Sequence, residues 1–187
     1  ALESLIDDTR FEVYLSLRDA NGCSRIGRTS LSMTGRPTLA PLEPEPVLDL
    51  GALGAFDDAG VTMSCVVCHE GRQLLYYTGW CRGVTVPFYL GVGLAVGRHG
   101  VFERLSPAPL LDRTAVDPFL TASPFVLHEG AIWRMWYVSG SEWRAHPGGP
   151  RHYYHIRYAD SGDGVTWRGT RLVCVDYREE EYAYRSA

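Results

Sequence analysis

The chain has 187 residues, of which 45% are hydrophobic and 21% charged, and this composition is typical of a globular chain that buries a core. It excludes the disordered, collagen-like and disulfide-scaffold classes, because Gly shows no three-residue period and five Cys is too few for a disulfide scaffold. The 18 basic residues, all Arg, and 22 acidic residues give a net charge of -4. The arginines form no basic stripe, so the sequence predicts no nucleic-acid partner.

The sequence also bears on location. No apolar run approaches the ~18 residues that span a bilayer, and the first residues lack the basic-then-apolar layout of a signal peptide. The odd number of Cys leaves at least one thiol unpaired, which suits a reducing compartment. We therefore predict no membrane partner and a cytoplasmic location, with secretion after removal of a leader left open.

Similar units follow one another along the chain. Two of them carry a His-Glu-Gly turn, which begins at His69 and at His128, followed by an aromatic pair that begins at Tyr76 and at Trp136. A weaker copy opens the chain. The aligned segments are 4–19, 65–80 and 124–140. The chain is therefore expected to repeat one structural unit about every sixty residues.

Further strands are predicted downstream in each unit. An apolar strand follows each aromatic segment, at 24–31, 89–96 and 154–161. A short strand that ends in Asp comes next, at 46–50, 109–113 and 174–178. These segments are rich in Val, Tyr, Trp, Leu and Thr and are separated by Gly, Asp and Pro, and no window shows a convincing helical period. Each unit is therefore read as four short strands, with little helix.

Repeated four-stranded antiparallel units are the signature of a β-propeller, in which each unit is one blade. We predict an all-β fold in which 1–187 form a single, partial propeller domain of about three blades. The expected blades are 1–48, 49–111 and 112–175, with 176–187 opening a further blade. A propeller needs at least four blades to close. The chain is therefore expected to be part of a longer polypeptide, or else a homo-oligomer completes the ring.

Polar residues gather in the loops that this arrangement places on one face. The loops between the second and third strands, 79–88 and 140–152, are extended. They hold aromatic and arginine side chains, which are suited to stacking on sugar rings and holding hydroxyl or phosphate groups. The predicted substrate-binding residues are Trp80, Arg82, Trp143, Arg144 and Arg185.

Carboxylates stand just ahead of the predicted inner strands: Asp58, with Asp57 beside it, then Asp117, then Glu181 in an acidic run. Inner strands crowd the propeller axis, so these three groups could converge on a central pocket. Clustered carboxylates raise one another's pKa, which lets one act as an acid while another stays ionised, as glycosidic bond cleavage requires. The structural alternative is that they make turns and accept backbone N–H bonds.

The segments LYYTGW, VPFYLGVGLAV, DPFLTASPFVL, WRMWYVSG, YHIRYADSGDGVTW and CVDYREEEYAY resemble the five-bladed β-propeller glycoside hydrolases, the superfamily of arabinanases, β-xylosidases and invertases. The most specific parts are the Asp117-Pro118 step and the segment 161–167. The resemblance implies an Asp base or nucleophile, a stabilising Asp and a Glu acid from successive blades. It assigns Asp117 as stabiliser, Glu181 (or Glu180) as acid, and Asp58 (or Asp57) as base.

Three classes of function stay open. The first is a glycosidase acting on a carbohydrate substrate, or a phosphorylase in which Arg82 or Arg144 holds phosphate. The second is a propeller that binds a glycan or a protein without catalysis, and the third is a half-propeller that self-associates. No cofactor and no metal are predicted, because the pair Cys65 and Cys68 would point to opposite faces of a strand.

Overall fold

A computed structural model describes the backbone of residues 2–7, 9–98 and 100–177, and the side chains of residues 9–98 and 100–177. The described residues are all β, as expected, and contain no helix that could cross a membrane. The strands are β1 Leu2–Asp7, β2 Arg10–Arg18, β3 Ser24–Ser32, β4 Thr38–Leu39, β5 Gly60–His69, β6 Arg72–Arg82, β7 Phe88–Arg98, β8 Val101–Arg104, β9 Thr121–Glu129, β10 Ile132–Arg144, β11 Arg151–Ser161 and β12 Arg168–Val175.

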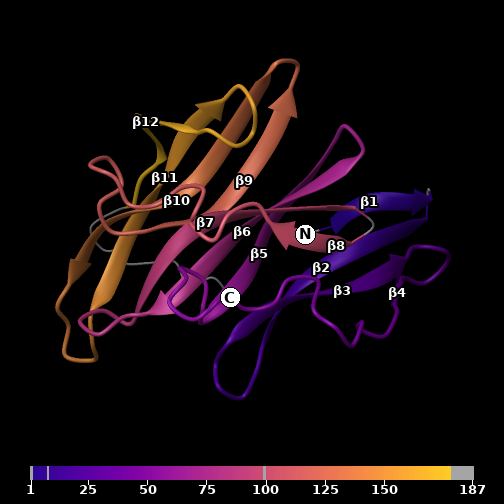
Figure 1. Cartoon of the computed structure of the whole chain (residues 1–187), viewed down its shortest axis with the longest axis horizontal. Coiled ribbons are helices and arrows are strands. Elements are labelled where there is room, and N and C mark those ends of the chain that lie inside the picture. Colours follow the sequence, from indigo (N-terminus) through magenta and orange to yellow (C-terminus); the bar gives the residue numbers. More distant parts are fainter. Residues whose placement is uncertain (1, 8, 99, 178–187) are drawn as a thin grey trace.

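The strands form three antiparallel meanders in chain order, β1–β4, β5–β8 and β9–β12 (Figure 1). The first two belong to one sheet, but only a single parallel pair, Ser24 with Gly60, joins them. The third meander is a separate four-stranded sheet. The repeat seen in the sequence is thus also a repeat of strand order.

The predicted fourth strands at 46–50 and 109–113 are wrong. Each of these segments makes one bridge to the third strand of its meander, Leu48 to Ile26 and Leu111 to Val92. The outer edge is formed instead by β4 and β8. Short runs of apolar residues make the two segments look like strands, but each segment contributes only one buried leucine.

The predicted long loops are also shorter than expected. Cross-strand pairing continues to Arg82 with Phe88 and to Arg144 with Arg151, so the connections shrink to 83–87 and 145–150. Trp80, Arg82, Trp143 and Arg144 consequently lie on strands. Strand backbone fixes the direction of their side chains more tightly than a loop would.

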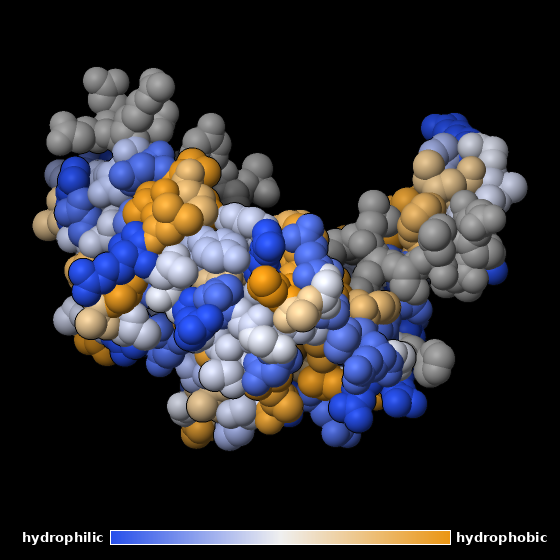
Figure 2. Space-filling model, turned by 90° about the horizontal axis from the view of Figure 1, so that it is seen from above, coloured by the Kyte–Doolittle hydropathy of each residue, from blue (hydrophilic) through white to orange (hydrophobic). Residues whose placement is uncertain are grey.

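The core lies between the meanders. Strand β6 carries two tyrosines back to back, because neighbouring residues of a strand point to opposite faces. Tyr76 packs in the cluster shared with the third meander, and Tyr77 packs in the cluster shared with the first. The middle meander is therefore covered on both sides, and the space-filling view shows a bent molecule with an arm at each end (Figure 2).

Candidate functional site

Two aspartates are buried just ahead of the first strands of the second and third meanders. Asp57 precedes β5 and is 0% exposed, and Asp117 precedes β9 and is 1% exposed. Tyr77 donates its hydroxyl to Asp57 Oδ2 over 3.0 Å, and Tyr137 donates to both oxygens of Asp117 over 3.2 and 3.1 Å. In both cases the tyrosine lies 20 residues after the aspartate. The two arrangements are repeat equivalents.

The tyrosines are suited to this role because they keep their protons. Burial, followed by the charge of the neighbouring aspartate, raises the pKa of Tyr77 and of Tyr137 far above the ordinary value. Each hydroxyl therefore stays a donor at any working pH. A buried carboxylate that accepts such a bond is fixed in orientation.

An arginine faces each aspartate. Arg104 on β8 donates through Nε to Asp57 Oδ2 over 2.8 Å and also bonds the carbonyl of Asp49. On β11, Arg157 Nε lies 3.8 Å from Asp117 Oδ1. A buried carboxylate requires such a counter-charge, because an isolated charge in a protein interior is strongly unfavourable.

The two arginines come from different strands for a steric reason. Tyr137 pairs across the sheet with Arg157, whereas Tyr77 pairs with Gly93. A Cβ atom at Gly93 would lie 2.2 Å from the Tyr77 ring, so no side chain fits there. The counter-charge for Asp57 therefore comes from Arg104 on the next strand.

Two polar atoms at this site have no partner among the described residues. Asp57 Oδ1 is buried without a hydrogen bond, and so is Arg157 Nη1. Gly51 packs so close that a Cβ there would lie 1.9 Å from Asp57 Oδ1. The environment of Asp57 thus holds one spare acceptor and that of Asp117 one spare donor, which is unusual in a protein interior.

The predicted base Asp58 lies in a different environment. Its carboxylate accepts the backbone N–H of Gly54 over 3.0 Å and contacts neither tyrosine nor arginine. Asp57 occupies the position equivalent to Asp117, and Asp58 the position of Pro118. The predicted acid Glu181, its neighbour Glu180, and Arg185 lie outside the described residues.

The predicted sugar-binding pair on β6 makes contacts to the first meander. Trp80 donates its ring N–H to Ser24 over 2.8 Å, and Arg18 lies over its ring at 5.4 Å. Arg82 donates to the carbonyl of Asn21 over 2.9 Å. These contacts fasten the second meander to the end of the first meander where β2 and β3 are joined.

The pair on β10 is arranged differently. Trp143 lies against Phe88 and His152, with ring centroids 5.4 and 5.2 Å apart, and all three are partly exposed. Arg144 pairs with Glu142 over 2.5 Å and stacks over Tyr153. The aromatic group joins the second and third meanders at the end of the sheets where β5 and β9 begin, which is also the end of Asp57 and Asp117.

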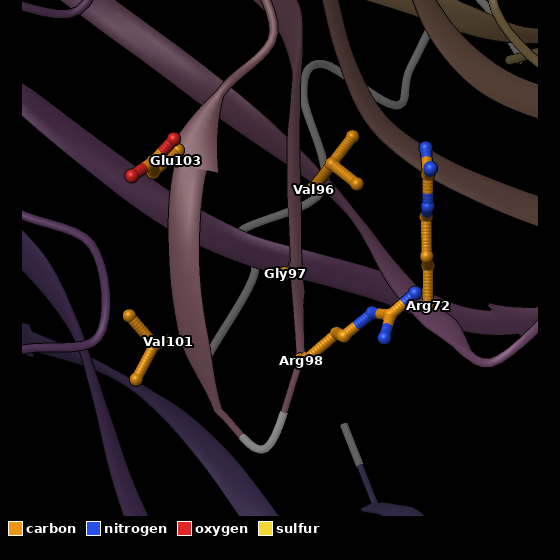
Figure 3. A pocket seen from close by; sticks show the side chains of 6 residues that line it. All are labelled: Arg72, Val96, Gly97, Arg98, Val101 and Glu103. Atoms are coloured by element: carbon orange, nitrogen blue, oxygen red, sulfur yellow. The ribbon is translucent and has the colours of Figure 1, made fainter.

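Two surface hollows lie away from these aspartates. The larger, about 350 Å³, is at the opposite end of the second meander (Figure 3). Its lining residues are Arg72, Val96, Gly97, Arg98, Val101 and Glu103. The smaller, about 200 Å³, lies on the first meander beside Glu12, Arg28 and Glu43. Within the described residues, no three His, Cys, Asp or Glu side chains gather as metal ligands would.

The segment 161–167 forms a tight turn that docks on the second meander. Asp163 Oδ1 accepts the backbone N–H groups of Val165 over 2.8 Å and Thr166 over 2.6 Å. The carbonyl of Gly164 then accepts the hydroxyl of Tyr76 over 2.8 Å. The Asp163-Gly164 pair of this segment therefore builds a contact between the second and third meanders.

Stability in acid should depend on Asp163. The N–H groups of Thr166 and Val165 lower its pKa to about 2, whereas an unfolded chain has an Asp pKa of about 3.9. The folded state therefore favours the ionised form of Asp163. The resulting contribution to folding stability is fully present above pH ~4 and is lost as the pH falls through ~2. We expect the urea midpoint to fall over this window and to fall less steeply in Asp163→Asn. An identical pH profile in that variant would contradict the assignment.

Comparison with known proteins gives relatives of unknown activity. No family model matches the chain. An uncharacterized protein of Mycobacterium tuberculosis, found in two strains, is 37% identical over 172 residues, which are 91% of this chain and 57% of the relative. The chain therefore spans little more than half the length of the curated relatives it matches.

Solved structures give a likeness in fold. A thermostable family-43 glycoside hydrolase is similar with a TM-score of 0.63 at 17% identity, over 96% of this chain and 56% of that one. A glycosyl hydrolase from Bacteroides ovatus gives 0.62 at 16% identity, over 90% and 47%. Sucrose-6-phosphate hydrolase from Lactobacillus gasseri gives 0.61 at 15% identity, over 86% and 31%. The chain is thus structurally similar to the five-bladed propeller glycoside hydrolases, over about half of a typical member.

Proposed function

We propose that the chain forms part of a carbohydrate-active protein that hydrolyses a glycosidic bond, and that its three meanders are blades of a propeller ring. The proposal is supported by the likeness in fold to glycoside hydrolases. The observation that carries it is the environment of Asp117, a carboxylate in an Asp-Pro step ahead of β9 that accepts the hydroxyl of Tyr137 and lies 3.8 Å from Arg157 Nε.

Asp117 is proposed as the stabilising carboxylate. Cleavage of a glycosidic bond passes through a transition state with positive charge on the sugar ring, and a fixed negative charge nearby lowers its energy. Because the Tyr137 hydroxyl already orients the carboxylate, little reorganisation is needed when that charge develops. Asp57, in the equivalent environment, replaces Asp58 as our proposed second carboxylate. Glu181 remains the proposed acid.

The test is turnover on a panel of nitrophenyl glycosides and oligosaccharides. We expect Asp117→Asn to lower kcat/KM by about 10²–10³-fold, because the amide keeps the shape but removes the charge. Asp112→Asn is the matched control, since Asp112 is exposed and accepts only the N–H of Arg113. Equal activity in the two variants would contradict the proposed catalytic role of Asp117.

A second candidate function is glycan binding without catalysis. Asp57 and Asp117 are enclosed by their partners, whereas Phe88, Trp143 and His152 offer partly exposed rings at the same end of the sheets. Aromatic faces of this kind stack on sugars. Saturable oligosaccharide binding with no turnover, measured by calorimetry beside the activity panel, would favour this candidate.

A further inference from the structure

The larger of the two surface hollows combines two arginines with apolar side chains (Figure 3). Across β7 and β8, Val96 pairs with Glu103 and Arg98 pairs with Val101, so these four side chains belong to one patch of the sheet. Arg72, the first residue of β6, lines the same hollow. We call it the arginine hollow. Its volume of about 350 Å³ is enough for a small molecule.

The two arginines of this hollow have no counter-charge among the described residues. Both are exposed, and neither Arg72 nor Arg98 has a side-chain hydrogen bond or ion pair there. Figure 3 shows the Arg98 side chain directed toward Arg72. Like charges on neighbouring strands repel each other unless an anion lies between them. In the smaller hollow, by contrast, Arg28 is paired with Glu43 over 2.8 Å, so its charge is already matched.

The internal repeat does not account for the pair of arginines. The second and third strands of all three meanders pair in equivalent registers. At the two positions of the pair, the first meander has Arg10 and Ser32, and the third has Ile132 and Gly162. Two cations occur together only in the second meander. A role shared by all the meanders, such as closing the turn between strands, therefore does not explain them.

A phosphate group matches the two free guanidinium groups. Each guanidinium can donate two parallel N–H bonds to a pair of oxygens. A phosphate monoester has three terminal oxygens and a charge of about −2, so it can bind both arginines, whereas one arginine already engages both oxygens of a carboxylate. The chain as a whole has a net charge of -4 and repels anions, so binding has to come from this local pair.

The other side of the hollow suits the rest of such a ligand. Figure 3 shows Glu103 across β7 from the two arginines. Its carboxylate is an acceptor for hydroxyl groups, and Val101, which is 71% exposed, offers apolar surface beside it. We propose that the arginine hollow binds a phosphate monoester that carries hydroxyl groups, with the phosphate on Arg72 and Arg98 and a hydroxyl on Glu103. The hollow lies away from Asp57 and Asp117, so this inference does not depend on the proposed hydrolysis.

The test is calorimetric titration of the chain with glycerol 3-phosphate, inorganic phosphate and glycerate at low ionic strength. We expect glycerol 3-phosphate to bind at one site per chain, and Arg72→Gln and Arg98→Gln each to weaken it by about tenfold, because charge-assisted hydrogen bonds are lost. Glu103→Ala should weaken the binding of glycerol 3-phosphate but not that of inorganic phosphate. Arg171→Gln is the matched control, since Arg171 is an exposed arginine on β12 that lines neither hollow.

Four outcomes would overturn the inference. The first is no saturable binding of either phosphate compound. The second is an equal loss of binding in Arg98→Gln and Arg171→Gln, which would indicate attraction to the surface in general. The third is glycerate binding as tightly as glycerol 3-phosphate, which would mean that the hollow does not select phosphate. The fourth is a Glu103→Ala variant that binds glycerol 3-phosphate unchanged, which would contradict the contact to a hydroxyl.

Discussion

Replacing Asp57 by alanine should lower the free energy of unfolding by about 3–5 kcal/mol, the usual consequence of removing one partner from a buried ion pair. The substitution leaves the Tyr77 hydroxyl without its acceptor and leaves Arg104 without its carboxylate. Burial of Asp57 and Tyr77 keeps water from replacing the tyrosine bond. Urea unfolding followed by tryptophan fluorescence measures the change.

The neighbouring residue is the control for this prediction. Asp58→Ala removes only the acceptor of the Gly54 N–H on the surface, so its effect should stay under about 1 kcal/mol. If Asp58→Ala were as destabilising as Asp57→Ala, the assignment of Asp57 as the repeat equivalent of Asp117 would be wrong.

The second large effect is expected at Gly93, which lies beneath the Tyr77 ring. A Cβ there would meet the ring at 2.2 Å and the hydroxyl at 2.6 Å, so Gly93→Ala must displace Tyr77 and weaken its bond to Asp57. Overpacking of this kind costs about 1–3 kcal/mol, against the slight gain that alanine normally brings to a strand. The unfolding free energy again provides the readout.

Gly162 supplies the matched comparison. A Cβ at Gly162 would meet no atom within 4 Å, so Gly162→Ala should leave stability within about 0.5 kcal/mol of the original chain. A Gly93→Ala variant that is as stable as Gly162→Ala would mean that Tyr77 can move aside without loss.

Strand order was largely predictable because the repeat aligns residue by residue around His69 and His128. The outer edges of the sheets were not predictable, because 109–113 contains a short apolar run like that of a strand, while β8 has only four residues. Both segments lie beside the third strand, and a sequence does not reveal which of them continues the ladder.

The candidate site was predictable in part. Asp117 stood out through its Asp-Pro step, but the choice between Asp57 and Asp58 depended on which carboxylate turns inward. A signal was present, since the spacing from Asp57 to Tyr77 matches that from Asp117 to Tyr137. No repeated sequence pattern pointed to Arg104 and Arg157, because the two arginines approach equivalent aspartates from different strands.

The paired tyrosines of β6 also determine how the molecule comes apart. The first meander is held to its neighbour through the side of Tyr77, and the third through the side of Tyr76. Either end can therefore open while the middle meander keeps one covered face, but the middle cannot open without exposing both. Amide protons of β6 should thus exchange last and report global unfolding, whereas those at the two ends report local opening.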